Sequence, residues 1–401
     1  MQIAAYRDSE LVPTLRAMFD AASEPERLSV GLCWQYSDTD SLAEFEHDPR
    51  IRRVQVPSVQ SHGVCWARSL TQGLYRDETF TLQLDSHHRF VPDWDEILIG
   101  MYEALLRKGV SKPLISAYLP HYSPEQSSAD WGTQAVNLLF GGYTQNGPWA
   151  VKPEYLPSQQ APATAPARFV SGHFLFTQGS FCREVPYDPN FYFFGEEQSL
   201  TLRAFTHGYD LYQPLNVLCW HYYGRDNMPK HWSDNGHWWQ ANDESFRQYN
   251  RLIQGAANLQ SGPFGLGNVR SLADFALYSG IDVKHRRVAS AALQGDFPVT
   301  VKNYHAPCSA PHLQALRVPI QITDPLFSLK ENTFVYTGSH DAAGVELYRL
   351  DLVKETLEVA LRDGYVDIVF DADRPAMSFT VWPYCEPAGW LSPQKFDLPA
   401  L

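Results

Sequence analysis

An aspartate and a histidine stand two residues apart in the segment 79–90, which reads TFTLQLDSHHRF. The pattern up to Asp85 is typical of a β-strand, and in extended backbone side chains two apart point to the same side. Asp85 and His87 can therefore share one divalent cation, whereas His88 points the other way and is expected to pack or to hydrogen-bond. A carboxylate oxygen and an imidazole nitrogen together suit Mn²⁺ or a similar ion that also holds phosphate oxygens.

The position of this pair in the chain favours a site, because a lone D-x-H is short and often arises by chance. A helix signal follows directly, with Asp93 as the N-cap and Glu96 three residues later. The pair is therefore expected at the carboxyl end of a strand, in a strand-to-helix turn. In open α/β sheets ligands bind at this edge.

A third metal ligand is needed, because two protein groups rarely fix an exchangeable ion. His221 is the best candidate, since it closes the strand pattern NVLCWH at residues 216–221 and should emerge at a strand end. The alternative is a core histidine whose hydrogen bonds are satisfied. The residues alone leave both possibilities open.

Two adjacent carboxylates, Glu196 and Glu197, begin a predicted helix directly after the apolar run FYFFG. One of them is expected to cap the helix and to interact with its dipole. The other would lie at the mouth of the same sheet, where a carboxylate can accept a hydrogen bond from a substrate hydroxyl or take its proton.

Several reaction classes are disfavoured by the sequence. It contains no G-x-S-x-G, G-x-G-x-x-G or P-loop pattern, which argues against an acyl-transfer hydrolase, a dinucleotide oxidoreductase and a kinase. Its 45 acidic against 32 basic residues give a formal charge of -13. Such a surface would not attract nucleic acid or an anionic membrane.

The compartment is predicted from two further features. No run of about 18 apolar residues occurs and the N-terminus MQIAAYRDSE lacks a secretory pattern, so we expect a soluble, cytoplasmic protein with no integral membrane segment. The six cysteines form no CxxC pair and are expected to be free, mostly buried thiols.

At 401 residues the chain is expected to hold more than one domain. Strand and helix signals alternate over residues 1–110, which predicts a mostly parallel sheet covered on both faces, the layout of a nucleotide-binding half. The expected strands are residues 2–6, 27–35, 51–56 and 79–85, and the expected helices are 9–22 and 64–75.

Residues 111–285 are predicted to form the acceptor and lid half of the same domain. Residues 156–167 are expected to form an exposed loop rich in Pro and Ala, and residues 224–243, with three Trp, a lid or a sugar platform. Residues 286–401 are predicted to form a smaller β-rich accessory domain with no catalytic feature.

With these pieces in place, the chain resembles the cytoplasmic UDP-N-acetylglucosamine transferases that modify hydroxyproline on an adaptor protein. The resemblance covers residues 1 to about 285, and the C-terminal part has no counterpart. The matching segments are AAYRDSELVPTLRAMFDAASEPERLSVGLCWQ, GVCWARSLTQGLYRDETFTLQLDSHHRF, GHFLFTQGSFCREVPYDPNFYFFGEEQSLTLRAFTHGYDLYQP, WHYYGRDNMPKHW and RSLADFALYSGIDV.

The resemblance implies a GT-A glycosyltransferase: a Rossmann-like mixed sheet with helices on both faces, here followed by the smaller β-rich C-terminal domain. It implies that Asp85 and His87 belong to a D-S-H metal motif, similar to DxD, and that His221 is the third ligand of Mn²⁺ or Mg²⁺. Glu196 and Glu197 match the family's G-E-E segment near the sugar and the acceptor.

The resemblance also implies a set of residues that bind the UDP-sugar donor. Ala5, Tyr6 and Arg7 would line the uridine pocket. The residues implied at the phosphates or the sugar are Arg68, Asp85, Ser86 and Lys230.

The activity implied is transfer of N-acetylglucosamine from UDP-GlcNAc to a hydroxyl of a protein, peptide or glycan, with retention of the donor's stereochemistry. The insertion at 156–167 and the unassigned C-terminal domain leave the acceptor open. Two alternatives are a catalytically silent protein that binds a glycan or nucleotide sugar, and a metal-dependent hydrolase, which would lack a second metal cluster.

Overall fold

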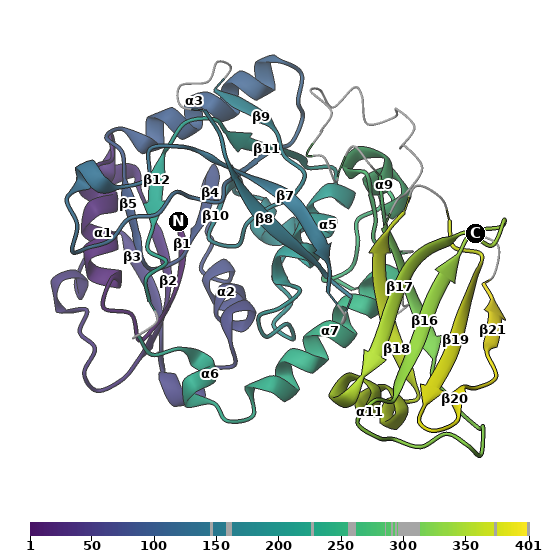
Figure 1. Cartoon of the computed structure of the whole chain (residues 1–401). Helices are drawn as coiled ribbons and strands as arrows, with labels where there is room; N and C mark the ends of the chain where they lie inside the picture. Colours follow the sequence, from purple (N-terminus) through teal and green to yellow (C-terminus); the bar gives the residue numbers. More distant parts are fainter. Residues whose placement is uncertain are drawn as a thin grey trace. The chain divides into compact units, whose positions relative to one another are not determined.

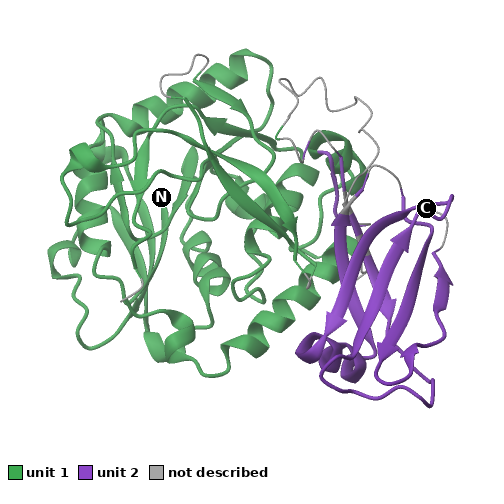
Figure 2. Cartoon of the chain, in the orientation of Figure 1, with its two compact units in different colours: residues 1–279, 295–306 green, residues 280–294, 307–401 purple. Residues whose placement is uncertain are grey.

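The computed structural model in Figure 1 describes residues 1–144, 147–157, 163–225, 228–255, 262–284, 286–289, 292, 295, 313–372 and 375–398. The chain divides into two compact units (Figure 2). Unit 1 comprises residues 1–279 with 295–306, and unit 2 comprises residues 280–294 with 307–401.

Unit 1 is built on one eight-stranded sheet (Figure 1). Its strands run in the order β3 (Ile51–Pro57), β2 (Val30–Tyr36), β1 (Gln2–Tyr6), β4 (Phe80–Leu84), β10 (Phe174–Gln178), β6 (Pro113–Ser116), β11 (Asp210–Pro214) and β9 (Thr164–Pro166). The first four strands are mutually parallel, and β6 is parallel to β11. The mixed α/β sheet predicted from the sequence is thus confirmed.

The expectation of a mostly parallel sheet was too simple, because β10 runs antiparallel to both of its neighbours, β4 and β6. Strand β9 is likewise antiparallel to β11. Strand β10 reads FLFTQ and its first four residues are buried. A buried apolar strand can pair in either direction, so its pattern carries no information on direction.

Helices cover both faces of this sheet, as expected. On one face Ile3 and Leu32 pack in a core with α1 (Leu11–Asp20) and α3 (Trp94–Arg107). On the other face α2 (Val64–Gln72) lies against β1 and β2. It approaches so closely that a Cβ on Gly31 would lie 3.2 Å from the Thr71 carbonyl oxygen.

The remaining helices of unit 1 follow the second half of the sheet. They are α4 (Phe181–Glu184), α5 (Glu196–Thr206), α6 (His231–Asp234), α7 (Trp238–Gln254) and α9 (Leu272–Ser279). No helix among the described residues is long and apolar enough to cross a bilayer.

The start of α3 corrects one local prediction. The helix begins at Trp94, but Asp93 has a left-handed backbone with φ of 59° and its side chain forms no cap. The carboxylate of Asp95 instead accepts hydrogen bonds from the backbone N–H groups of Ser23 and Glu24, at 2.8 and 3.1 Å. Asp93 is thus the N-cap, as predicted, but the capping box with Glu96 does not form, because the Asp93 side chain makes no cap hydrogen bond.

The region expected to be an exposed loop, residues 156–167, is in part a strand. Residues 158–162 lie outside the described residues, but Thr164–Pro166 forms β9. Before it, β7 (Val136–Tyr143) and β8 (Trp149–Tyr155) form an antiparallel hairpin in a stretch whose sequence shows little periodicity.

Unit 2 is β-rich, as predicted. Its main sheet has the order β17 (Glu346–Val353), β16 (Phe334–His340), β19 (Ser378–Cys385) and β20 (Gly389–Trp390), with β21 (Gln394–Asp397) also on β19. Strands β15 (Leu313–Pro319) and β18 (Tyr365–Asp371) form a separate antiparallel pair, as do β13 (Ile281–Asp282) and β14 (Arg287–Val288).

The core of unit 2 draws on β15, β18 and the main sheet together with α11 (Lys354–Asp363), a helix that the sequence analysis did not predict. Val335, Phe379 and Val381 point into this core from the main sheet. The opposite face of the main sheet is therefore turned away from it.

Candidate metal centre and carboxylate site

Three side chains meet at the carboxyl end of β4. Nε2 of His221 lies 3.2 Å from Oδ2 of Asp85, and Nε2 of His87 lies 3.7 Å from the same oxygen. Potential ligand atoms of the three residues all lie within 4.8 Å of one another. We call these three residues the Asp85 cluster.

Long-range strand pairing assembles the cluster, not the alternation within one strand. Strand β4 ends at Leu84, and the chain turns before β5 (His88–Phe90) begins. Strand β5 pairs antiparallel with β12 (Cys219–His221), with His88 opposite His221. This pairing brings a histidine from the second half of unit 1 to the D-x-H segment.

His88 has the role predicted for it. Its Nε2 accepts a hydrogen bond from the Asp85 backbone N–H at 3.2 Å, and its Nδ1 donates to the carbonyl oxygen of Trp220 at 3.0 Å. Burial holds the pKa of His88 well below its usual range, so the ring is neutral. His88 therefore positions Asp85 and β12.

The charges in the cluster suit a divalent cation. Burial alone would raise the pKa of Asp85, but the hydrogen bond from His221 and the charge of Arg68 outweigh it and hold that pKa well below its usual range. Burial lowers the pKa of His221 to about 4, so at neutral pH its imidazole is in the form that binds metals.

The spacing of the ligand atoms fits the same ion. Mn²⁺ and Mg²⁺ bind oxygen or nitrogen at about 2.1 Å, so adjacent ligands of one ion stand about 3 Å apart. The separations of 3.2 and 3.7 Å from Asp85 are close to that. His221 also has a buried Nδ1 that finds no hydrogen-bond partner among the described residues. The donor set thus fits the predicted metal.

Asp8, a buried aspartate that the sequence analysis missed, contacts two residues of the D-S-H segment. Oδ2 of Asp8 accepts hydrogen bonds from Ser86 Oγ at 2.6 Å and from His87 Nδ1 at 2.8 Å, and lies 3.1 Å from Nη2 of Arg225. Burial opposes ionisation of Asp8, but its contacts with His87, Arg225 and Ser86 lower its pKa. The carboxylate is therefore charged, so His87 Nδ1 must be the donor and Nε2 faces Asp85.

A sequence signal for Asp8 did exist. Asp8 follows β1, the parallel neighbour of β4, and the carboxyl ends of parallel neighbours meet at one edge of a sheet. Arg225, the other missed residue, comes from the segment 224–243, which was interpreted as a lid. Its Nη1 lies 3.5 Å from His87 Nε2.

Arg68 joins the cluster to the carboxylates of α5. Its Nη2 donates to Asp85 Oδ1 at 2.7 Å, and its Nε lies 3.0 Å from Oε1 of Glu196. Tyr187 donates its hydroxyl to the same oxygen at 2.8 Å. Burial raises the pKa of Glu196 in spite of these partners.

Glu197 points to a different set of groups. Its Oε1 accepts from the backbone N–H of Gly172 at 2.8 Å and from Ser171 Oγ at 3.1 Å. Burial and the nearby Glu196 charge raise the pKa of Glu197 to about 7. The prediction that one of the two carboxylates caps α5 is wrong, because neither side chain caps that helix and Gly195 is its N-cap.

His173 is linked to Glu197 through the hydroxyl of Ser171. Nε2 of His173 accepts from the backbone N–H of Leu119 at 3.1 Å, and its Nδ1 lies 2.9 Å from Ser171 Oγ. Burial holds the pKa of His173 well below its usual range, so its single ring proton is on Nδ1 and is donated to Ser171. The Ser171 hydroxyl is then free to donate to Glu197.

The predicted uridine-binding residues lie at the end of β1. Ala5 is fully buried in the core, whereas Tyr6 and Arg7 extend beyond it. The Tyr6 hydroxyl and Arg7 Nη1 both donate to Oδ2 of Asp234, at 2.7 and 2.6 Å. The end of β1 is thus tied to α6.

Lys230 does not join the Asp85 cluster. Its ammonium lies 5.6 Å from the ring of Trp232, and it forms no ion pair among the described residues. Within the segment 224–243, whose residues 226 and 227 lie outside the described part, the guanidinium next to the cluster is that of Arg225.

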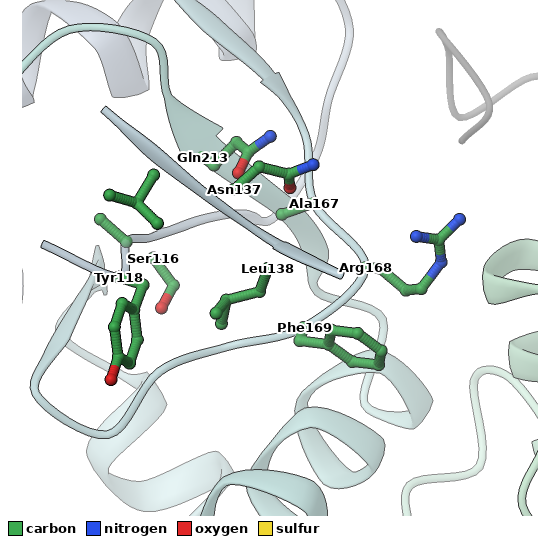
Figure 3. Close-up of a pocket in the computed structure, with 10 residues that line it drawn as sticks. Ser116, Tyr118, Asn137, Leu138, Ala167, Arg168, Phe169 and Gln213 are labelled. Atoms are coloured by element: carbon green, nitrogen blue, oxygen red, sulfur yellow. The ribbon is translucent and has the colours of Figure 1, made fainter. Parts of the chain in front are cut away.

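A small pocket beside this site has no room for a sugar. Figure 3 shows Ser116, Tyr118 and Leu138 around it and Arg168 pointing away. The volume open to the centre of a water molecule is about 10 Å³, room for roughly one water. Tyr118, which lines this pocket, also meets the ring of His173 at 4.9 Å.

The geometry defines a mixed-sheet protein with a candidate metal centre and a carboxylate pair at the end of its strands. The sequence profile of a family described as Glycosyltransferase (GlcNAc) matches residues 1–48 and 43–285. The chain therefore belongs to that family and is a glycosyltransferase. The match confirms the resemblance at the level of a GlcNAc glycosyltransferase family. No match was found among curated proteins.

Among solved structures, the chain is similar to GalNAc-T7, crystallised with UDP, GalNAc and Mn²⁺, with 12% identity and a TM-score of 0.43 over 69% of this chain and 53% of that one. It thus spans about half the length of the GalNAc-T7 chain. S. aureus TarS gives 9% identity and a TM-score of 0.38 over 99% of this chain and 85% of its own. Likenesses this distant support no inference about the activity.

Proposed function

We propose that the protein transfers N-acetylglucosamine from UDP-GlcNAc to a hydroxyl acceptor in a metal-dependent reaction. The observation that carries this proposal is the convergence of Asp85, His87 and His221 at the sheet edge of a chain in the GlcNAc glycosyltransferase family. A GT-A type of site, in which the metal lies next to the donor diphosphate, accounts for both the convergence of these residues and the family match.

The three residues of the Asp85 cluster would hold Mn²⁺ or Mg²⁺. When bound, such an ion neutralises the negative charge that develops on the departing diphosphate. Asp8 holds His87 with Nε2 turned toward Asp85. Carboxylates that fix a ligand histidine in this way raise its basicity and its affinity for metal.

Cationic side chains of this acidic protein help to hold the donor phosphates. Arg68 lies against Asp85, and Arg225 lies 3.5 Å from His87 Nε2. Arg225 is better placed than Lys230 to meet a diphosphate, and Lys230 would act only from the exposed end of α6. The hydroxyl of Ser86 is directed to Asp8, so Ser86 would help to hold that carboxylate beside His87.

The two carboxylates of α5 have different roles. Glu196 is buried between Arg68 and Tyr187 and positions the guanidinium next to Asp85. Glu197 is only partly buried and has a pKa near 7, so it can take the proton of an acceptor hydroxyl at neutral pH. Retention of the donor's stereochemistry belongs to the proposal on the strength of the family resemblance.

At the end of β1, Tyr6 and Arg7 would contact the uridine, with Ala5 supporting them from the core. Both side chains also contact Asp234 of α6, so donor binding is coupled to the position of this helix. We place the enzyme in the cytoplasm. The described cysteines are all free and buried, which fits a reducing compartment.

The acceptor is a hydroxyl on a protein, peptide or glycan, and hydroxyproline on an adaptor protein remains the acceptor suggested by the family resemblance. Screening lysate proteins with labelled donor for mass shifts would identify the substrate.

The test is release of UDP when the protein is incubated with Mn²⁺ and UDP-GlcNAc. We expect release that chelation of the metal abolishes and Asp85→Asn strongly reduces. UDP-galactose and UDP-glucose serve as competing donors. If UDP-GlcNAc and the competing donors all remain intact in the presence of the metal, the proposal is overturned.

A further inference from the structure

The outer face of the main sheet in unit 2 carries a group of aromatic side chains. In β19, Phe379 and Val381 are buried in the core, so by strand alternation Trp382 and Tyr384 point to the opposite face. In β16, Val335 points into the core and Tyr336 points outward. We call the outward side chains the aromatic face: Phe334, Tyr336, Trp382, Tyr384 and Trp390.

These rings contact one another and remain open to solvent. The ring centroids of Trp382 and Trp390 are 4.6 Å apart, and Trp390 also meets Phe334 at 5.2 Å and Tyr384 at 5.5 Å. Trp382 is 36% exposed and Trp390 is 45% exposed. Large apolar side chains clustered on an exposed surface mark an interaction site.

The aromatic face is rigid. The indole N–H of Trp382 donates to the Leu391 carbonyl oxygen at 2.7 Å, which fixes the ring plane and satisfies its only donor. Tyr336 lies across its own strand, since a Cβ on Gly338 would stand 1.8 Å from the tyrosine oxygen. A side chain at position 338 would therefore push the Tyr336 ring from this position.

Polar groups line the same cleft as the rings. A cleft of about 350 Å³ is bounded by Tyr336, His340, Arg349, Thr380, Trp382 and Trp390. Such a volume is typical of a small-molecule site. The guanidinium of Arg349 lies 5.1 Å from the Tyr336 ring and is held by Asp351 at 3.0 and 2.8 Å.

This combination selects the chemistry of the ligand. A sugar ring has C–H groups on its faces, which carry partial positive charge, and hydroxyls around its edge. Its faces match the negative faces of indole rings, and its edge matches the donors and acceptors of Arg349, Asp351 and Thr380.

Other ligand classes fit less well. Single-stranded nucleic acid needs unpaired cations beside the aromatic rings, and here Asp351 neutralises Arg349. An added peptide strand pairs with the backbone at a sheet edge, whereas Tyr336 and Trp382 lie on β16 and β19, which are paired on both sides.

We propose that the aromatic face of unit 2 binds a neutral oligosaccharide, with sugar rings stacked on Trp382 and Trp390 and their hydroxyls bonded to Arg349, Asp351 and Thr380. The site lies beyond residues 1–285, the span of the family profile, and does not depend on the function proposed for unit 1. Its role, which rests on the proposed function, would be to retain a substrate that already carries sugar.

The test is calorimetric titration of the full-length protein with three probes: the tetramers of N-acetylglucosamine, of β-1,4-glucose and of α-1,4-glucose. We expect at least one to bind with a dissociation constant of about 1 mM or lower. Trp382→Ala and Trp390→Ala should each weaken that binding by about tenfold or more. Asp85→Asn should leave it unchanged, which separates this site from the donor site.

Matched controls make the result decisive. Tyr365→Ala removes an aromatic side chain of unit 2 that lies on β18, outside the aromatic face, and is 36% exposed like Trp382, so this variant should bind the same probe as the unaltered protein. Thr380→Ala and Trp390→Phe alter the face more gently and cover the case in which a Trp→Ala variant unfolds. Failure of all three tetramers to bind at about 10 mM, or unchanged binding in both Trp→Ala variants, would overturn the proposal. So would a concentration-dependent dimer of the unaltered protein that Trp382→Ala dissociates, because the face would then belong to a second copy.

Discussion

The Asp85 cluster and the aromatic face are both built on β-sheets, but the chain constructs them in opposite ways. The cluster and its partners Asp8 and Arg225 join ionisable side chains from segments 79 to 138 residues apart, with Asp8 and His87 deeply buried. The aromatic face joins uncharged rings from neighbouring strands, and its indoles are open to solvent.

This difference follows from what each region must do. Stabilising charge on a leaving group needs fixed groups away from water, where electrostatic interactions are strong. Each member of the cluster is held by another charge, so the loss of one disturbs the rest. The rings of the aromatic face are held by packing on one another, by the bond from Trp382 to the Leu391 carbonyl and by the bond from the Tyr336 hydroxyl to Glu346. The loss of one ring should therefore disturb only the rings in contact with it.

The largest effect is expected from Asp85→Asn. The amide cannot replace the charge that faces His87, His221 and Arg68, so the rate of UDP release should fall on the order of 10³-fold. Steady-state kinetics at saturating Mn²⁺ measures this. The matched control is Asp367→Asn in unit 2, which breaks an ion pair with Arg317 and should leave the rate unchanged. If the rate of UDP release fell by less than about tenfold in Asp85→Asn, the proposed metal site would be ruled out.

The next effect is expected from Asp8→Asn. The change keeps the shape of the side chain but removes the charged acceptor of His87 Nδ1–H, so affinity for Mn²⁺ should fall by about 10- to 100-fold. Mn²⁺ titration followed by electron paramagnetic resonance measures affinity without turnover. Asp48→Asn, at a carboxylate paired with Arg50, is the control in the same unit. Equal affinities in the two variants would show that Asp8 does not position His87.

Glu197 should set the pH dependence of the transferase activity. Its raised pKa of about 7 means that the carboxylate is protonated at lower pH, and only the ionised form can take a proton. Activity should therefore rise with pH to a plateau, falling about tenfold for each pH unit below 7. Glu197→Gln should abolish this slope while Mn²⁺ affinity stays the same. A slope that persists in the variant would assign the titration to another group.

The smallest effect is expected at the junction of β1 and α6. Arg7 and Asp234 are about one-third exposed, so Asp234→Asn should lower the free energy of unfolding by less than about 1 kcal/mol. Chemical denaturation measures it, with Asp367→Asn as the matched exposed pair in unit 2. If Asp234→Asn lowered the free energy of unfolding by more than twice this expected limit, the contact would resemble the buried network around Asp8.

Sequence patterns predicted the parts of both regions that depend on local geometry. The D-x-H segment, the strand ending near it and the helix beginning at Trp94 were found, as was the β-rich character of unit 2. Local patterns did not give the partners of these residues. Three examples are the direction of β10, the ion pair of Arg68 with Glu196 and the contact of Tyr6 with Asp234. Each depends on segments far apart in the sequence, and the pattern of one segment does not indicate its partner.

The sequence by itself determined the family and the identity of the three candidate ligands. These follow from residue types and from the covalent geometry of a strand, which fixes the side on which each side chain lies. Only the tertiary structure decided that Asp8 orients His87, that Arg225 lies beside it and that Glu197 has a pKa near 7. Hydrogen bonds and burial depend on which distant segments meet, and the pairing of β5 with β12 decides that for this site.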